Sequence, residues 1–332
     1  MPGKAKTSTE ERLIARHFRP LATHPGAFGL ADDAAAIAPP PGCDLVLTTD
    51  GVISGVHVFA DDPPDLIARK ALRMNLSDLA AKGAAPLGFL LALSLPANIE
   101  SSWIAAFARG LGKDAKFYGC PLLGGDTDHT PGPAAVSIAA FGAVPRGKMV
   151  RRAGAKVGDA VMVTGTIGDA ALGLMLRRDP GLAGPWRLGK AGIARLVGRY
   201  RLPQPRNALA RALLRYASSA MDISDGLAGD LGKLYRASKL AADVDVGQVP
   251  LSPAARVALA AAPELMDTVL SGGDDYEIAL TIAPKKVAAF RRAAAAAGVP
   301  VTEIGRLRKG EGARFMQNGK VLSFARAGYS HF

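Results

Sequence analysis

The stretch Pro121-Leu122-Leu123-Gly124-Gly125-Asp126-Thr127 runs from apolar residues into two glycines and a carboxylate. Crowded carboxylates cost solvation and repel one another unless cations lie between them. Mg²⁺ suits such a set, because it binds a few carboxylates, retains water and bridges to substrate phosphates. Four other short loops also place Asp beside small residues: Ala31-Asp32-Asp33, Thr48-Thr49-Asp50-Gly51, Met221-Asp222-Ile223-Ser224-Asp225-Gly226 and Ser271-Gly272-Gly273-Asp274-Asp275. Because the chain has five such loops, the sequence predicts a metal-dependent enzyme that acts on phosphates.

Length and composition indicate a globular chain with a sizeable core. Its 332 residues are enough for about two domains of the usual size of about 150 residues. Hydrophobic residues make up 49% and charged residues 21%. The longest apolar run, residues 87–95, is far shorter than the roughly 20 residues that cross a bilayer. The N-terminus lacks the apolar core of a signal peptide, so we expect a cytoplasmic protein that does not enter a membrane.

The cysteine content and the charge distribution argue against other classes of protein. Cys43 and Cys120 are the only cysteines, and their spacing suggests neither a disulfide framework nor a zinc knuckle. The net charge of +12 is concentrated in residues 141–215, which hold fifteen Lys or Arg against three Asp. This stretch could steer anionic substrates or keep the protein soluble. It lacks the interleaved aromatic residues and groove-reading motifs of nucleic-acid binders, so we do not expect nucleic acid as a partner.

Strand and helix patterns alternate without a strict βαβ order. They predict an α+β fold of mixed β-sheet and helices, rather than a doubly wound parallel sheet. The turn-rich segment 154–159 places the boundary near residue 150, which gives domains at 1–150 and 151–332. We expect helices at 7–18, 64–82, 169–178, 206–217, 227–240 and 284–297, with one more that is capped by Ser102. We expect strands at 44–49, 87–95, 135–144, 160–164, 242–246, 277–282 and 301–306, with the Asp clusters in loops at strand ends.

Two common nucleotide-binding motifs are absent from the sequence. No Gly-Lys pair is followed by Ser or Thr, which excludes the P-loop, and no Gly-x-Gly-x-x-Gly fingerprint opens a helix. A nucleotide site must therefore depend on metal ions. Phosphoryl transfer needs two anions to be positioned and the charge between them to be neutralised.

Several backbone and side-chain groups could position the phosphates and neutralise their charge. The Gly124-Gly125 backbone can approach a phosphate closely, and Arg152 is a candidate phosphate clamp. Taken singly, each loop is as well explained as a turn, and structural roles are favoured for Asp78 as a surface charge, His57 as a core histidine and Arg152 as a solvated cation. Five such loops together favour the metal site. The candidate ligands are Asp33, Asp50, Asp78, Asp126 and Asp222, with added oxygens from Thr48 and Thr49.

In order and spacing these motifs, together with Asn75-Leu76-Ser77-Asp78-Leu79-Ala80 and the continuation Tyr276-Glu277, resemble the thiamine-monophosphate kinase family over nearly the whole chain. The resemblance implies ATP-dependent phosphorylation of thiamine monophosphate to thiamine diphosphate with several Mg²⁺ ions. It also implies the two-domain fold of the aminoimidazole-ribonucleotide-synthetase superfamily. That fold pairs a mixed-sheet N-terminal domain, which dimerises and binds ATP and Mg²⁺, with an α/β-sandwich C-terminal domain that completes the site.

The resemblance also assigns residues. Direct in-line attack by the substrate phosphate is implied, and because that nucleophile is already anionic, we assign no residue as a general base. Gly125, Asp126, Arg152 and Ser224 match positions that contact ATP. His57, Asp274 and an aromatic residue, Phe324 or Tyr329, match positions that bind the substrate. The positions that match metal ligands are Asp33, Thr48, Thr49, Asp50, Asp78, Asp126, Asp222 and Asp225.

Three departures and several rivals accompany this resemblance. Ala31 replaces a frequent Gly, Asp274 replaces a common Glu, and the stacking aromatic near the C-terminus is displaced. Selenophosphate synthetase would need a reactive cysteine near the N-terminus, and the hydrogenase-maturation dehydratase would carry a C-terminal cysteine tail, whereas this chain ends Tyr329-Ser330-His331-Phe332. Aminoimidazole-ribonucleotide synthetase shares the fold. A basic nucleic-acid binder would show salt-sensitive affinity and indifference to the Asp residues.

Overall fold

The computed structural model describes residues 8–317, 319–322 and 328. The chain forms two compact units. Unit 1 comprises Met1–Leu79 and Ala85–Arg146, and unit 2 comprises Ala80–Ala84 and Gly147–Phe332. Within the described residues no helix is both long and apolar enough to cross a membrane.

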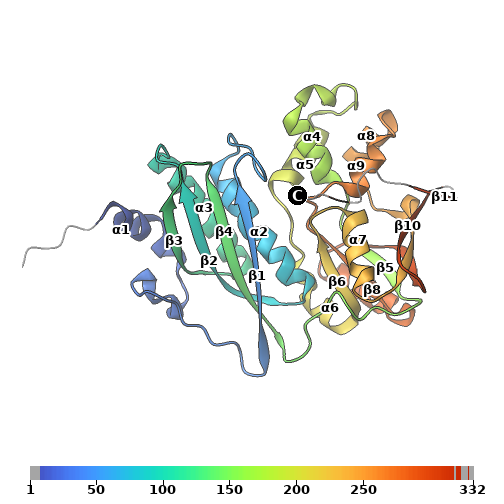
Figure 1. Ribbon diagram of the computed structural model, residues 1–332, viewed down its shortest axis with the longest axis horizontal. Coiled ribbons are helices and arrows are strands. Elements are labelled where there is room, and N and C mark those ends of the chain that lie inside the picture. The colour runs from blue at the N-terminus through green and yellow to red at the C-terminus, as the bar shows by residue number, and fades with distance from the viewer. Residues whose placement is uncertain (1–7, 318, 323–327, 329–332) are drawn as a thin grey trace, which may run out of the picture. The chain divides into compact units, whose positions relative to one another are not determined.

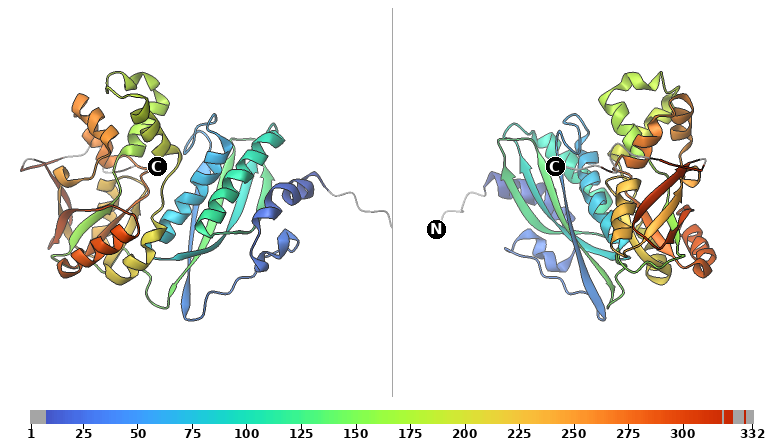
Figure 2. Two further views of the ribbon diagram at one scale, coloured as in Figure 1. Left: turned by 180° about the vertical axis from the view of Figure 1, so that it is seen from behind. Right: turned by 45° about the vertical axis from the view of Figure 1, so that its right-hand side comes forward.

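Unit 1 is a mixed sheet with helices on one face. Its strands lie in the order β1-β4-β2-β3, in which β4 is antiparallel to β1 and β2 while β3 is parallel to β2. Helices α2 and α3 cover one face of this sheet (Figures 1 and 2). The elements are α1 (Thr9–Leu13), β1 (Cys43–Ile53), α2 (Pro64–Ala81), β2 (Ala85–Leu95), α3 (Ser101–Tyr118), β3 (Leu122–His129) and β4 (Ala135–Pro145), with a π-helix at Ile14–Phe18 and short 3-10 turns at Arg19–Leu21 and Pro25–Leu30.

A buried carboxylate joins the two covering helices. Asp114 of α3 accepts hydrogen bonds from Nε of Arg73 at 2.5 Å and from Nε of Arg69 at 3.1 Å, both on α2. A Cβ at Gly110 would lie 2.3 Å from the carbonyl oxygen of Asp65, so the helix backbones can approach here only because residue 110 is glycine. These contacts fix α2, which carries Asn75 and Asp78, against α3.

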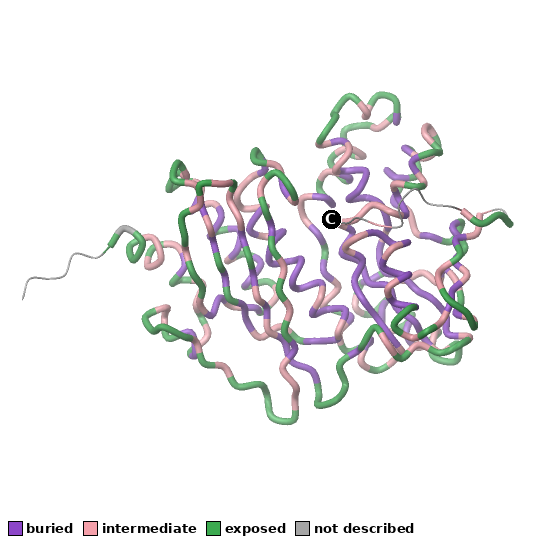
Figure 3. The backbone as a smooth tube through the Cα atoms, viewed as in Figure 1, coloured by how far each residue is buried: buried purple, intermediate pink, exposed green. Residues whose placement is uncertain are grey.

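Unit 2 contains a sheet that is covered on both faces. Its strands lie in the order β11-β10-β7-β9-β5-β8-β6. Strand β5 is fully buried (Figure 3). Its alternate residues enter different cores, because Val161 and Val163 pack with α7, whereas Ala160 and Met162 pack with α6 and α10. Its strands are β5 (Ala160–Thr164), β6 (Ala217–Ile223), β7 (Ala241–Asp245), β8 (Glu277–Ile282), β9 (Val301–Arg308), β10 (Gly312–Gln317) and β11 (Lys320–Val321).

A further helical cluster packs beside this sheet in unit 2. Leu172 of α4, Leu196 of α5, Ala255 of α8 and Val269 of α9 share one buried apolar core. The helices of unit 2 are α4 (Asp169–Arg178), α5 (Lys190–Arg201), α6 (Ala210–Tyr216), α7 (Leu227–Arg236), α8 (Pro253–Ala261), α9 (Leu265–Ser271) and α10 (Val287–Ala296), with 3-10 turns at Pro180–Ala183, Asn207–Leu209, Val246–Gln248 and Pro284–Lys286.

The α+β class is confirmed, but several element predictions were wrong. Asp50 lies inside β1 rather than at its end, because β1 continues to pair with β4 as far as Ile53. Gly124-Gly125-Asp126 belongs to strand β3, which pairs with β2, and does not form a loop. Ser102 does not cap α3, because the helix begins at Ser101 after Glu100, to which Ser102 donates a hydrogen bond.

Candidate functional site

One group of candidate residues lies where β1 packs on α2 in unit 1. Thr48 Oγ1 donates a hydrogen bond to Asp78 Oδ2 at 2.5 Å. The backbone N–H of Asp50 donates to Oδ1 of Asn75 at 3.1 Å, and Asn75 is three residues before Asp78 on α2. The structure therefore brings Thr48, Asp50 and Asp78 to the helix-covered face of the sheet, because residues 48 and 50 share one face of the strand.

Thr49 lies on the other face. It falls between Thr48 and Asp50 on β1, so its side chain points away from α2. Its hydroxyl donates to the carbonyl oxygen of Ile138 at 3.1 Å. The three consecutive side chains of residues 48–50 therefore cannot converge on one ion from within this strand.

A second group surrounds a cavity of about 710 Å³ in unit 1. Asp33 and Asp126 both line it, together with Gly125. Asp126 is paired in register with the exposed Ala92 of β2, so it lies on the sheet face that α2 and α3 leave open. Much of the remaining lining is apolar and includes Ile14 and Phe18.

The two glycines of β3 allow the close packing beside this cavity. A Cβ at Gly125 would lie 1.9 Å from the carbonyl oxygen of Leu91, which no other residue could avoid. Oδ1 of Asp126 accepts a hydrogen bond from the N–H of Thr127 at 2.9 Å, which fixes the carboxylate beside the strand. β3 is an edge strand, so its outer backbone groups are not engaged by another strand of this sheet. Gly125 and Asp126 thus have the geometry for contact with a phosphate or its metal ion.

His57 holds a turn together. Its Nδ1 accepts a hydrogen bond from the N–H of Ile53 at 3.0 Å, and its backbone carbonyl accepts one from Lys70 Nζ at 3.0 Å. The side chain is partly exposed. The substrate role of His57 stays a prediction.

In unit 2 the loop after β6 carries three of the candidates. Asp222 is buried near the end of β6, while Ser224 and Asp225 follow it. The N–H groups of Ser224 and Asp225 donate to Oδ2 of Asp230 at 3.0 and 2.9 Å. Burial raises the pKa of Asp230, although the hydrogen bond from Lys233 opposes that rise. Asp230 therefore fixes the backbone of this loop through two hydrogen bonds.

Lys233 is a cation that the sequence reasoning missed at this loop. Its Nζ donates hydrogen bonds to Asp225 and, at 2.8 Å, to Asp230. Burial lowers the pKa of Lys233, but hydrogen bonds to Asp225 and Asp230 raise it by more. Asp225 thus has a protein cation beside it, whereas Asp222 is buried near the end of β6. The i, i+3 spacing of Asp230 and Lys233 on one helix was a signal available in the sequence.

The loop 271–276 is bound to the loop of Ser224. The N–H of Asp274 donates to the carbonyl oxygen of Ser224, and the N–H of Tyr276 donates to that of Ile223, both at 2.8 Å. Asp274 and Tyr276 have φ angles of 70° and 49°, which cost about 1–2 kcal/mol each for residues other than glycine. A Cβ at Gly273 would lie 2.3 Å from the Ser224 carbonyl oxygen, so the loops touch through backbone. The structure therefore brings Asp274 beside Ser224 and Asp225.

Arg152 lies near this part of unit 2. Its side chain is exposed, and the preceding residue, Arg151, accepts a hydrogen bond at its carbonyl oxygen from the N–H of Ala220 at 3.1 Å. This bond places the segment of Arg152 alongside β6, two residues before Asp222. Phe324 and Tyr329, the two candidates for the stacking aromatic, lie outside the described residues.

Sequence reasoning also missed a buried ionic cluster behind Asp274. Asp275 and Glu277 are fully buried, and Arg199 is 3% exposed. The carboxylate of Glu277 accepts hydrogen bonds from Arg199, Arg206 and Thr164. Burial raises the pKa of Asp275 well above its usual range, despite hydrogen bonds from the N–H of Gly168. Nothing in the local sequence joins these residues, because Arg199 and Glu277 are 78 positions apart.

The donor chemistry fits Mg²⁺, although the arrangement is not a closed cage. Carboxylate and hydroxyl oxygens are the ligands that this ion prefers, and it keeps several waters. Within the ranges 8–317 and 319–322 and at residue 328, the structure shows no group of three or more His, Cys, Asp or Glu side chains that could hold a metal ion. Asp50 with Asp78, and Asp33 with Asp126, are the oxygen sets in unit 1 that could each supply part of a coordination shell.

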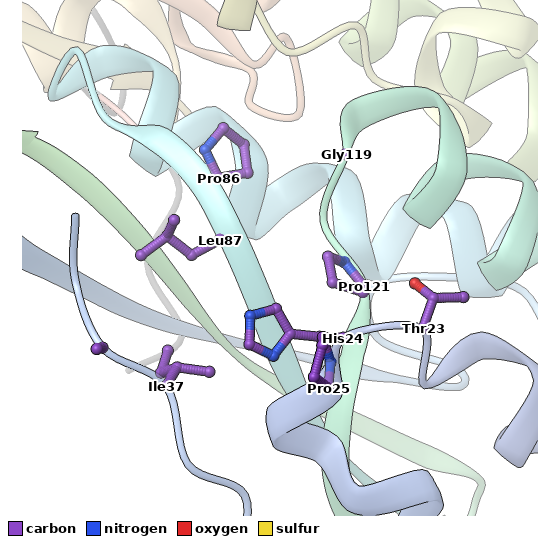
Figure 4. Close-up of a pocket in the computed structure, with 9 residues that line it drawn as sticks. Thr23, His24, Pro25, Ile37, Pro86, Leu87, Gly119 and Pro121 are labelled. Atoms are coloured by element: carbon purple, nitrogen blue, oxygen red, sulfur yellow. The ribbon is translucent and has the colours of Figure 1, made fainter.

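A smaller hollow of unit 1 has few polar groups. It measures about 340 Å³ and is lined mainly by proline and aliphatic residues around His24 (Figure 4). Nδ1 of His24 already accepts a hydrogen bond from the N–H of Gly26 at 3.0 Å. This hollow gathers no set of polar groups comparable with the cavity at Asp126.

Comparison with known proteins places the chain in a family. Residues 31–144 match the N-terminal domain of AIR synthase related proteins, and residues 156–317 match the C-terminal domain. The thiamine-monophosphate kinase of Caulobacter vibrioides is 43% identical over 331 residues, which cover 98% of this chain and 92% of that protein.

Solved structures show the same likeness. The crystal structure of thiamine-monophosphate kinase from Stenotrophomonas maltophilia is 38% identical, with a TM-score of 0.82 over 94% of this chain and 96% of the other. A structure described as AaThiL complexed with AMPPCP and TMP is 29% identical, with a TM-score of 0.76 over 92% of this chain and 97% of the other.

Proposed function

This chain belongs to the thiamine-monophosphate kinase family of AIR synthase related proteins, and we propose that it transfers the γ-phosphoryl group of ATP to thiamine monophosphate, giving thiamine diphosphate and ADP. The observation that carries this proposal is the cavity of unit 1 in which Asp33, Gly125 and Asp126 lie together. It offers carboxylates, a close backbone approach and an apolar wall, which are the groups that a nucleotide with its metal ion needs.

The reaction requires positioning more than proton transfer. A phosphate oxygen of thiamine monophosphate forms a bond to the γ-phosphorus, and the bond from that phosphorus to the β–γ bridging oxygen breaks, which leaves ADP. A phosphate monoester is already largely dianionic at neutral pH, since its second pKa is about 6, so a strong general base is unnecessary. The chain must therefore align two anions and offset their repulsion.

We assign the residues to these tasks as follows. Mg²⁺, when bound, neutralises the charge that develops between the two phosphates. Arg152, Gly125 and Ser224 orient the ATP phosphates, and Asp274 with His57 orients the acceptor. Phe324 is the candidate for stacking on the thiamine. The residues that would hold the several Mg²⁺ ions are Asp33, Thr48, Asp50, Asp78, Asp126, Asp222 and Asp225. Thr49 faces away from Thr48 and Asp50, so it could serve only a different ion from theirs.

Unit 1 also supports the proposal of a homodimer. Its sheet face opposite α2 and α3 exposes Leu47, Ile53 and Leu90, which are 63%, 40% and 36% exposed. Several large apolar side chains on one open sheet face are typical of a protein interface. Light scattering after size-exclusion chromatography should give twice the 34.3 kDa mass of the chain. A monomer at every concentration would contradict this assignment.

The function is tested by ADP release with ATP and Mg²⁺, with thiamine monophosphate compared against free thiamine. We expect release only with the monophosphate and complete loss in EDTA, restored by excess Mg²⁺. Thiamine diphosphate should appear in equal amount by chromatography. Binding of ATP without turnover of either thiamine compound would leave the family assignment intact and refute the substrate.

A further inference from the structure

The feature that carries a further inference is the turn 274–276 in unit 2. Two of its residues, Asp274 and Tyr276, have positive φ angles although neither is glycine. Such conformations persist only where the surrounding structure enforces them, and they concentrate at functional sites. A strained turn beside Ser224 and Asp225 therefore needs a support.

Arg199 of α5 provides that support. Its Nη2 donates to the backbone carbonyl oxygen of Asp275, the central residue of the turn, at 3.0 Å. The same nitrogen donates to Oε1 of Glu277 at 3.0 Å, so the guanidinium joins the turn to the first residue of β8. Arg199 thus binds this segment at two places, the middle of the turn and the residue that follows the turn.

The energetic cost of burying Arg199 indicates that this side chain does more than fill space in the core. Its side chain is nearly completely buried, and its Nε and Nη1 have no hydrogen-bond partner among the described residues. Buried N–H groups without partners are rare in folded proteins, because they lose their bonds to water. An apolar side chain would fill this position at lower cost if packing were its only task.

The turn is also continuous with the neighbouring loop. Hydrogen bonds run from the N–H of Asp274 to Ser224 and from that of Tyr276 to Ile223. A Cβ at Gly226 would lie 2.4 Å from the carbonyl oxygen of Ser271, so the contact between the two loops extends beyond these bonds. A support for one loop therefore supports both.

We propose that Arg199 is a positioning residue, which holds the strained turn 274–276 on the loop 222–226 so that the acceptor-binding Asp274 and the nucleotide-binding Ser224 form one preorganised surface. Arg199 acts through Asp275 and Glu277 and contacts no substrate itself. The inference rests on the proposed kinase function for its catalytic consequence, but its structural part is independent of that function.

Arg206 offers a matched control. It donates hydrogen bonds to the same carboxylate of Glu277 through Nε, at 2.6 Å, and through Nη2, and neither bond reaches the turn. Arg199→Met and Arg206→Met each remove one guanidinium from Glu277. Only the first removes a hydrogen bond from the Asp275 carbonyl oxygen.

Hydrogen–deuterium exchange on the full chain tests the structural part. We expect Arg199→Met to speed amide exchange in peptides covering 271–277 and 222–226 by about tenfold, which corresponds to about 1.4 kcal/mol. Arg206→Met should leave those peptides within about twofold of the wild type. Equal exchange in both variants, or no change in either, would overturn the proposal. If Arg199→Met does not fold, Arg199→Lys replaces it in the same comparison, since lysine keeps the charge and loses the planar fork.

Steady-state kinetics well below the melting temperatures tests the catalytic part. We expect Arg199→Met to raise KM for thiamine monophosphate about tenfold with kcat within about twofold, and Arg199→Lys to recover part of this loss. Equal losses of activity in the Arg199 and Arg206 variants would indicate a purely structural role. If the wild type does not phosphorylate thiamine monophosphate, the proposed function fails, and the exchange result still decides the role of Arg199.

Discussion

Oδ1 of Asn75 accepts a hydrogen bond from the backbone N–H of Asp50 at 3.1 Å, and the side-chain amide of Asn75 donates to the carbonyl oxygen of Ala71 at 3.0 Å. The first bond ties β1 to α2 at the position where the candidate metal ligand Asp50 lies. Asn75 is fully buried, so both bonds are made out of contact with water.

Asn75→Ala should lower both stability and turnover. It leaves the N–H of Asp50 without its buried acceptor, which we expect to cost about 1–3 kcal/mol of unfolding free energy in urea titrations. Ser77→Ala is the matched control on the same helix, because Ser77 Oγ is buried without a hydrogen-bond partner among the described residues. Its unfolding free energy should stay within about 0.5 kcal/mol of the wild type. Equal destabilisation by both variants would refute this role of Asn75.

Asp50→Asn and Asp126→Asn should each remove most turnover while the fold stays intact. Each change deletes a negative charge that we assign to Mg²⁺, so kcat should fall on the order of 10²-fold or more. Asp128→Asn is the control, because Asp128 is exposed two residues further along β3. Melting temperatures should be measured beside the rates. Wild-type turnover in Asp50→Asn or Asp126→Asn would refute the assignment of that residue as a metal ligand.

Arg152→Ala should weaken the use of ATP selectively. Loss of a phosphate-binding guanidinium should raise KM for ATP about tenfold and change KM for thiamine monophosphate little. Its exposed neighbour Arg151 provides the control variant Arg151→Ala, which alters the net charge equally. A raised KM for thiamine monophosphate with normal use of ATP would assign Arg152 to the acceptor instead.

Gly273→Ala should disturb the joined loops. The new Cβ would lie 2.3 Å from the carbonyl oxygen of Ser224, and relief of this clash should cost about 1–3 kcal/mol of unfolding free energy together with activity. At Gly189 a Cβ would meet nothing within 4 Å, and φ is −78°, so Gly189→Ala should change stability by less than about 1 kcal/mol. Thermal unfolding and initial rates check both variants. Full activity of Gly273→Ala would show that the loops can separate without harm.

Asp243 should give a defined acid dependence of stability. The hydrogen bond from Arg314 lowers the pKa of Asp243 to about 2 from 3.8, and Arg308 contributes to the same direction. Because the folded pKa lies below the unfolded one, this carboxylate stabilises the fold above about pH 4, and the contribution is lost as the pH falls toward 2. Asp243→Asn should flatten the stability profile in that window, and Arg314→Gln should flatten it partly. An unchanged profile in both would show that the ion pair is not maintained in solution.

Much of the fold follows from apolar patterns in the sequence. Strands β5 and β8 are short stretches of mostly apolar residues, and their predicted ranges, 160–164 and 277–282, match the structure, as does α4 at 169–178. Helices α5, α8 and α9 were missed. The α5 and α8 stretches contain several Gly or Ala residues, and α9 is only seven residues long. All three pack into the core around Leu196 and Val269, which local patterns do not reveal.

The candidate site was less accessible to prediction. The motifs identified which Asp residues to inspect, but not that Thr48 and Asp50 face α2 while Asp126 faces the open side of the sheet. That division depends on strand register, which a slip of one residue would reverse. The support of Asp274 by Arg199 depends on contacts between residues that are distant in the sequence, so only the folded chain shows it.

The position of β3 at the edge of its sheet has a consequence for solubility. An unpaired strand edge invites pairing with another chain, and charged side chains on the edge are a common protection against it. β3 carries Asp126 and Asp128 on an otherwise weakly charged strand with two glycines. The carboxylate that we assign to a metal ion thus also discourages aggregation, so selection for solubility alone would oppose an apolar residue at position 126.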